Sequence, residues 1–249
     1  KVSLTEEGEA FLPHAEEVLS SVEAARASVG VGSASPTGTL RVSAPASFGR
    51  MHLIPALKGF LSLYPGLTVD FRFSDSIVDL VEGGFDIAIR NSELKDSTLI
   101  ARKLAPDHRI ICAAPDYLQT YGEPHTPDQL AHHRGVNFLS GQNRRQLPWQ
   151  FLQDGSDTSH MSRHGILVNE SSAYVQCGVA GFGILQAPGL TLDRYLADGS
   201  LVEVLKRYRP RPRPVSVLYP SRSQLAPQVQ AFVDWLMQSF PALYDRWLE

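Results

Sequence analysis

Hydrophobic and polar side chains follow a strand, helix, strand pattern between residues 39 and 73. Residues 39–44 alternate polar and apolar side chains, which is typical of a strand. From Ser47 to Leu61 the apolar residues recur three and four positions apart, which predicts a helix. Residues 67–73 alternate again, so the stretch predicts a β-α-β unit.

The same alternation continues with a short helix expected over 77–83 and a third strand over 85–89. Because strands and helices alternate, a parallel sheet is the expected arrangement. Ligands of such sheets bind at the carboxyl ends of the strands. Ser47 and Arg90 follow two of these strands, so we expect both at the ligand edge.

Beyond residue 90 the pattern predicts a second set of elements that is long enough to close its own core. Helical segments are expected after residue 115 and over 126–131, 171–180 and 225–247. Strands are expected over 98–104, 108–114, 136–139, 149–152, 165–168, 201–204 and 215–219, with 209–214 as an extended connector.

Residues 1–30 predict one long helix that Thr5 caps and Pro13 kinks. Its apolar residues form a narrow seam at heptad spacing that includes Leu4, Phe11, Val18 and Val22. The seam either packs on its own domain or forms a coiled-coil-like contact with a second subunit. Residues 31–38 read as a flexible linker.

Composition limits the possible classes of protein. The chain has 249 residues and is 43% hydrophobic, which allows two modest lobes. A net charge of -3 gives no basic excess, so the chain is not expected to bind DNA unaided. The sequence holds no apolar run of membrane-spanning length and no signal peptide, and it begins without Met, as a fragment does. Cys112 and Cys177 are too few for a disulfide framework, which suits a reducing cytoplasm.

Several dense motifs resemble the effector-binding domain of LysR-type transcriptional regulators. They are GTLRVSAP followed by SFG (38–49), LIPALKGFLSLYPGLTV (53–69), DLVEGGFDIAIR (79–90), GVNF (135–138), AGFGILQAP (180–188) and LTEEG (4–8). Together they cover nearly the whole chain.

The resemblance implies an α/β fold of two Rossmann-like lobes in the periplasmic-binding-protein type II architecture, preceded by a long linker helix. It implies a linker or dimerisation helix over 1–30, a linker over 31–38, one regulatory lobe over 39–114 plus 216–249, and another over 115–215. It also implies a homodimer or homotetramer paired through the linker helix, and DNA contact through an N-terminal winged helix-turn-helix domain absent from this chain.

Ser47 and Phe48 lie beside a helix N-terminus, where backbone N–H groups favour an anion such as a carboxylate. Serine is also a frequent N-cap, so Ser47 is either a ligand contact or a cap. Arg90 either forms a bidentate pair with an anionic effector or bridges Asp86 or Asp75.

The second lobe offers a matching set of polar groups. Asn137 and Phe138 either face the cleft or belong to a core or turn. Asn169, Glu170 and Ser171 open a helix that would face the first one as an anion clamp, unless Asn169 is only its N-cap; Glu170 argues against a strongly acidic ligand. By resemblance, the packing turn at Gly183 and Ile184 lies at the cleft wall. The expected ligand contacts are Ser47, Phe48, Arg90, Ile100, Asn137, Phe138, Asn169, Ser171, Gly183 and Ile184.

Catalytic and metal chemistry find little support in the sequence. His132 and His133 are adjacent, His160 and His164 have no nearby carboxylate partner, and Glu170 lacks a second acid or base. We therefore expect no enzyme, no metal and no cofactor.

The favoured function is a cytoplasmic ligand sensor for a small anionic or aromatic metabolite that alters oligomer geometry and transcription. A periplasmic-type solute-binding protein is the alternative, and an enzyme on the same fold is a third.

Overall fold

The computed structural model describes residues 35–75, 80, 83–91, 99–140, 145–162, 165–221 and 225–247, with isolated positions before residue 35. The helix expected over 1–30 and the short helix over 77–83 therefore lie mostly outside the described residues. One described contact bears on the first helix. The Thr5 hydroxyl accepts a hydrogen bond from the Gly8 N–H at 3.2 Å, as a cap would.

The first lobe is built on a five-stranded sheet whose order is β2-β1-β3-β13-β4. Parallel pairing joins β1 to β2 and β3, whereas β13 runs antiparallel to β3 and β4. The strands are β1 (Gly38–Ala44), β2 (Leu67–Phe73), β3 (Ile87–Arg90), β4 (Leu99–Asp107) and β13 (Arg213–Pro220).

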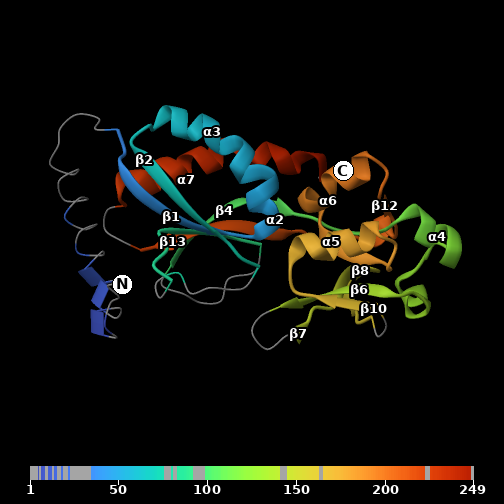
Figure 1. The fold of residues 1–249 in the computed structure, drawn as a ribbon. Helices are drawn as coiled ribbons and strands as arrows, with labels where there is room; N and C mark the ends of the chain where they lie inside the picture. Colours follow the sequence, from blue (N-terminus) through green and yellow to red (C-terminus); the bar gives the residue numbers. More distant parts are fainter. Residues whose placement is uncertain are drawn as a thin grey trace.

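Two helices cover one face of this sheet (Figure 1). The first runs without a break through α2 (Ala46–Phe48), a π-helical turn η1 (Gly49–Leu53) and α3 (Ile54–Leu63). The second is α7 (Pro227–Ser239). Their contact is aromatic, because the Phe60 and Phe232 rings meet edge to face at 5.2 Å. The periodic apolar residues of both helices therefore close one core over β1 and β3.

The second lobe repeats this strand order. Its strands pair as β10-β6-β7 and β11-β5-β12, and a parallel bridge between Gly135 and Ile184 joins β6 to β11. The order is therefore β10-β6-β11-β5-β12, with β5 antiparallel to both of its neighbours. The strands are β5 (Arg109–Ala113), β6 (Gly135–Ser140), β7 (Arg145–Gln146), β10 (Gly165–Val168), β11 (Leu185–Pro188) and β12 (Val202–Glu203), with β8 (Trp149–Gln153) and β9 (Ser156–His160) as a separate hairpin.

Helices α4 (Pro115–Tyr121), α5 (Ser171–Val179) and α6 (Gly189–Ala197) belong to this second lobe, with the 3-10 turns η2 (Pro127–His132) and η3 (Lys206–Tyr208). The lobes lie end to end, and α2 of the first lobe approaches α5 and α6 of the second (Figure 1). This approach brings the helix starts of the two lobes together.

Three boundaries differ from the sequence expectations. Strand β5 pairs in the second sheet, so the chain leaves the first lobe near His108 and not at residue 114. Strand β13 begins at Arg213, inside the expected connector. The expected final helix over 225–247 stops at Ser239 and gives way to a 3-10 segment, η4 (Pro241–Trp247), because Pro241 has no N–H to continue the ladder.

Candidate functional site

A cavity of about 310 Å³ lies between the two lobes. Four aromatic residues, Phe48, Phe138, Trp149 and Tyr174, contribute to its lining. Its cationic residues are Arg90, Arg109 and Arg213, and its other polar residues include Ser47, Asp75, Ser171 and Gln186. The cavity therefore combines flat apolar walls with an excess of positive charge.

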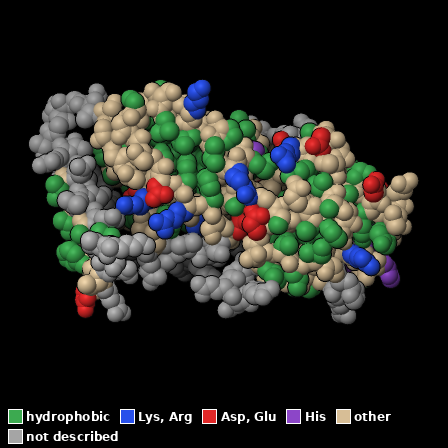
Figure 2. All heavy atoms as spheres, viewed as in Figure 1, with side chains coloured by type: hydrophobic (Ala, Val, Ile, Leu, Met, Phe, Trp, Pro, Cys, Tyr) green, Lys and Arg blue, Asp and Glu red, His purple; other side chains and the backbone are tan. Residues whose placement is uncertain are grey.

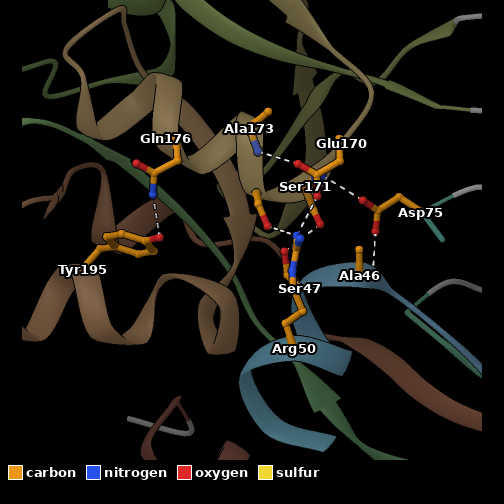
Figure 3. A network of polar contacts seen from close by, with 10 residues as sticks. Ala46, Ser47, Arg50, Asp75, Glu170, Ser171, Ala173, Gln176 and Tyr195 are labelled. Carbon is orange, nitrogen blue, oxygen red and sulfur yellow. Dashed lines mark hydrogen bonds and ion pairs between the residues drawn. The ribbon is translucent and has the colours of Figure 1, made fainter. Parts of the chain in front are cut away.

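The carboxylate of Asp75 joins the helix starts of the two lobes (Figure 3). One oxygen accepts a hydrogen bond from the Ala46 N–H at 3.1 Å, and the other accepts one from the Ser171 N–H at 2.8 Å. Ser47 Oγ donates to Ser171 Oγ at 2.6 Å beside it. The two helix starts do face each other, and a carboxylate of the chain itself already lies between them.

A second polar link crosses between the lobes at Arg50. Its Nη2 donates to Glu170 Oε1 at 2.8 Å and also contacts the hydroxyl of Ser172. Figure 2 shows basic and acidic side chains next to each other near the middle of the molecule, where the two lobes meet. Burial raises the pKa of Glu170, but hydrogen bonds from the Ala173 and Ser172 N–H groups and from Arg50 outweigh it and hold this pKa below its ordinary value.

Glu170 is also the N-cap of α5, because its other oxygen accepts from the Ala173 N–H at 2.7 Å. The alternative that Asn169 only caps this helix is therefore wrong. Glu170 does not line the cavity described above, and its charge is directed at Arg50. The Glu170 carboxylate therefore repels an anion inside the cavity less than the sequence suggested.

Arg90 is buried, with 9% of its surface exposed. Its guanidinium donates to Ser43 Oγ and to the Ile89 carbonyl, each at 2.8 Å, and burial lowers its pKa. These bonds hold the group at the cavity wall. The hydrogen-bond partners of Arg90 are thus Ser43 and Ile89, which does not match the alternative that Arg90 bridges Asp75 or Asp86.

A further charged group lies where the chain crosses between the lobes. Burial raises the pKa of Asp107 to about 7, against the opposing effect of Arg109 and Arg213. Burial also lowers the pKa of Arg109, which Asp107 raises and Arg213 lowers. The carboxylate of Asp107 is 1% exposed, and neither of its oxygens has a hydrogen-bond partner in the described part of the chain.

Five of the expected contacts line the cavity: Ser47, Phe48, Arg90, Phe138 and Ser171. Ser47 does not cap its own helix, because its hydroxyl donates to Ser171. Ile100, Asn137, Asn169, Gly183 and Ile184 are not among the lining residues. Strand alternation explains Asn137, which points away from the face of Phe138 and donates to the Gly135 carbonyl at 3.3 Å. Ile100 lies on β4 and is 38% exposed.

Gly183 and Ile184 form a packing turn. Gly183 has a φ of +155°, and a Cβ there would lie 2.4 Å from the Arg134 carbonyl oxygen. The Ile184 N–H donates to that same carbonyl at 2.9 Å, and the Ile184 carbonyl accepts from the Val136 N–H at 2.8 Å. The backbone groups of Ile184 are therefore engaged by the second lobe itself.

Sequence reasoning missed Asp75, Arg109, Trp149, Tyr174, Gln186 and Arg213 as cavity residues. A signal for two of them was available. Arg109 and Arg213 lie at the two places where the chain crosses between the lobes, and crossing segments of a two-lobed fold run beside the cleft. The alternation of Arg and Pro over 209–214 instead suggested a solvated connector.

Other kinds of site are not evident in the described part of the chain. No group of three or more His, Cys, Asp or Glu side chains there has the arrangement to hold a metal ion. None of the helices described is long and apolar enough to cross a membrane.

Two sheets of matching strand order with a cavity between them define a two-lobed binding domain of the type II periplasmic-binding-protein fold. The family model of the LysR substrate binding domain matches residues 33–241. The chain therefore belongs to the family of LysR-type transcriptional regulators, which confirms the resemblance seen in the motifs and the two-lobed α/β fold.

Known relatives agree with this assignment. The chain is 33% identical to the HTH-type transcriptional regulator YhjC of Escherichia coli over 236 residues, which cover 95% of this chain and 79% of YhjC. It is 30% identical over 239 residues to an HTH-type transcriptional repressor of Pseudomonas aeruginosa, covering 96% and 75%. Among solved structures, the full-length Vibrio cholerae virulence activator AphB superposes with a TM-score of 0.70 at 27% identity, covering 95% of this chain and 80% of AphB. These relatives are regulators of transcription, so the alternative of a periplasmic solute-binding protein is set aside.

Proposed function

We propose that the cavity between the lobes binds a small anionic metabolite with a flat apolar body, and that this binding is the sensing step of a cytoplasmic regulator. The observation that carries the proposal is the lining of one cavity by three arginines and four aromatic residues. Guanidinium groups suit a carboxylate, and aromatic walls suit a planar apolar group. The chain acts in this role as a sensor and not as an enzyme.

The contacts between the lobes supply the means of switching. Asp75, Ser47 and Arg50 all connect the first lobe to the start of α5. A ligand that enters the cavity touches Ser47 and Ser171 and so changes the stability of this arrangement. A ligand can shift the equilibrium between two conformations only by the difference between its binding free energies to them. A difference of about 5.5 kcal/mol is needed to reverse a 1:99 ratio of the two conformations.

The readout in the whole protein follows from the family. We propose DNA contact through an N-terminal winged helix-turn-helix domain, and a homodimer or homotetramer paired through the helix at 1–30 with Leu4, Phe11, Val18 and Val22 in its seam. Within this chain we propose one lobe over 39–107 plus 213–247 and another over 109–208. The relatives include both a repressor and an activator, so the family does not fix the direction of regulation.

A thermal-shift screen of several hundred metabolites tests the sensing role. A ligand at 100 times its dissociation constant adds about 2.7 kcal/mol to the free energy of unfolding, which raises the melting temperature. We expect a small set of chemically related anions to stabilise the chain and to lose this effect in Ser47→Ala. Ser62→Ala is the matched control, since Ser62 lies exposed on α3 and donates to the Lys58 carbonyl of its own helix. Hits that stabilise both variants equally would contradict binding at Ser47.

A further inference from the structure

Two buried N–H groups at the cavity wall make no well-formed hydrogen bond to the described part of the chain. Both Arg109 Nε and Trp149 Nε1 are buried and lack a hydrogen-bond partner among the described residues. Buried donors are nearly always paired in folded proteins, so two unpaired donors in one cavity call for an acceptor from outside the chain. Both residues belong to the second lobe, at the start of β5 and of β8.

Both donors lie near the Tyr174 hydroxyl. Burial raises the pKa of Tyr174 to about 12, while hydrogen bonding with Gln186 and with Trp149 and the charge of Arg109 lower it, which places both groups near this hydroxyl. The hydroxyl is already engaged, because it donates to the Gln186 carbonyl and accepts from the Gln186 N–H, each at 3.1 Å. The indole N–H therefore shares the Tyr174 oxygen with the Gln186 N–H and makes no well-formed hydrogen bond to it, and Arg109 Nε has no acceptor among the described residues.

The acceptor that fits is an anion with two oxygens. Arg90, Arg109 and Arg213 all line the cavity, and the nearest buried carboxylate, Asp107, has a pKa raised to about 7 and thus carries only part of a charge. Asp75, the carboxylate in the lining, is held by the two helix starts. The cavity is therefore short of negative charge on the side of Arg109 and Trp149.

The walls next to these donors are aromatic. Phe138 meets Tyr174 edge to face at 5.5 Å, and Phe48 lines the cavity from the first lobe. A planar ring packs well against such faces and edges. An aliphatic carboxylate of the same charge would leave these walls less well covered.

We propose that the cavity binds an aromatic monocarboxylate whose two oxygens accept hydrogen bonds from Arg109 Nε and Trp149 Nε1, with its ring between Phe138 and Phe48. This inference rests on the proposed function and specifies its ligand class and anion subsite. It assigns the anion to the second lobe and away from the helix starts that Asp75 occupies.

Nuclear magnetic resonance of the 15N-labelled chain tests this directly, with benzoate as the probe and benzamide as its neutral counterpart. The indole resonance of Trp149 is assigned through Trp149→Phe, which keeps an aromatic ring and removes the N–H. Trp235 is the internal control, because its ring packs against Phe60 and Phe232 in the first lobe, at 5.0 and 5.2 Å. Benzoate is expected to shift the Trp149 indole signal saturably, to leave Trp235 in place, and to bind at least ten-fold more tightly than benzamide.

Two variants complete the test by calorimetry. Trp149→Phe is expected to weaken benzoate binding several-fold and Arg109→Gln at least ten-fold. Arg211→Gln, which removes an exposed ion pair with Asp157 and a hydrogen bond to the Gly155 carbonyl, is expected to leave benzoate binding unchanged. Trp149→Phe keeps the test valid if Arg109→Gln fails to fold.

The outcomes separate this inference from the proposed function. Saturable benzoate binding with the Trp149 indole unmoved, or equal affinity for benzamide, overturns the anion subsite and leaves the sensing role intact. No binding of benzoate overturns the ligand class, while metabolites of other chemistry that still depend on Ser47 would keep the proposed function. Failure of both benzoate and the metabolite screen would contradict both.

Discussion

Asp107 is a carboxylate buried beside Arg109, Arg213 and Tyr244, and its environment makes folding depend on pH. Its pKa is raised from 3.8 to about 7, so between these values the folded chain holds a proton that the unfolded chain releases. The free energy of unfolding therefore falls as pH rises through this window and levels off above it. Burial and charged neighbours are tertiary features, so this raised pKa could not be predicted from the residues around Asp107 in the chain.

Asp107→Asn is expected to remove this dependence. Relative to the unmodified chain, the variant should gain on the order of 2 kcal/mol in free energy of unfolding between pH 5 and pH 7.5. Urea unfolding at both pH values measures it. Asp157→Asn, at an exposed site on β9, is the control and should follow the unmodified chain. Parallel curves for Asp107→Asn and the unmodified chain would contradict the raised pKa.

At the scale of elements, local pattern predicted strands and helices where periodicity is strong. Residues 67–73 and 165–168 were predicted with the bounds that β2 and β10 have. Strand β9 was missed because it is polar throughout and exists through its pairing with β8. Ser47 could be predicted as a cavity residue from its place after β1, and Phe138 from its place in the carboxyl half of β6. Arg109 and Asp75 depend on which lobe each segment joins.

The link that Asp75 makes between the two helix starts can be tested by Asp75→Asn. An amide keeps the size but offers only one acceptor, so one backbone N–H loses its partner or faces another donor. We expect a loss of about 1–3 kcal/mol in free energy of unfolding. Hydrogen exchange should also show faster exchange of the Ala46 and Ser171 amides, with Asp157→Asn again as the control. Unchanged protection of both amides would exclude this role.

Gly165 is required where β10 meets β6. Its φ is +133°, and a Cβ would lie 1.8 Å from the Gly135 carbonyl oxygen, so Gly165→Ala must displace the backbone pairing. We expect a loss of about 2–4 kcal/mol in urea unfolding. Gly155→Ala is the matched control, because its φ is +79° with open space around its Cβ position, and it should lose only about 1 kcal/mol. Equal losses would show that crowding against β6 is not the cause.

At the scale of the whole molecule, two lobes of the same strand order flank a cavity, and polar contacts between their helix starts link the lobes beside it. The two-lobed architecture followed from the family motifs, since periodicity alone does not say that β5 crosses into the second sheet. The excess of arginine and aromatic residues in the cavity came only from the three-dimensional arrangement. Ligand binding and lobe contact share Ser47 and Ser171, which is why we connect sensing to lobe geometry.

A crystal structure of the chain with the tightest ligand from the metabolite screen tests this connection most directly. We expect the ligand between the lobes, against Phe48 and Phe138, with its anionic group within hydrogen-bonding distance of a cavity arginine. A ligand found instead in the surface hollow around His132, His133 and Phe182, with the cavity between the lobes empty, would contradict it.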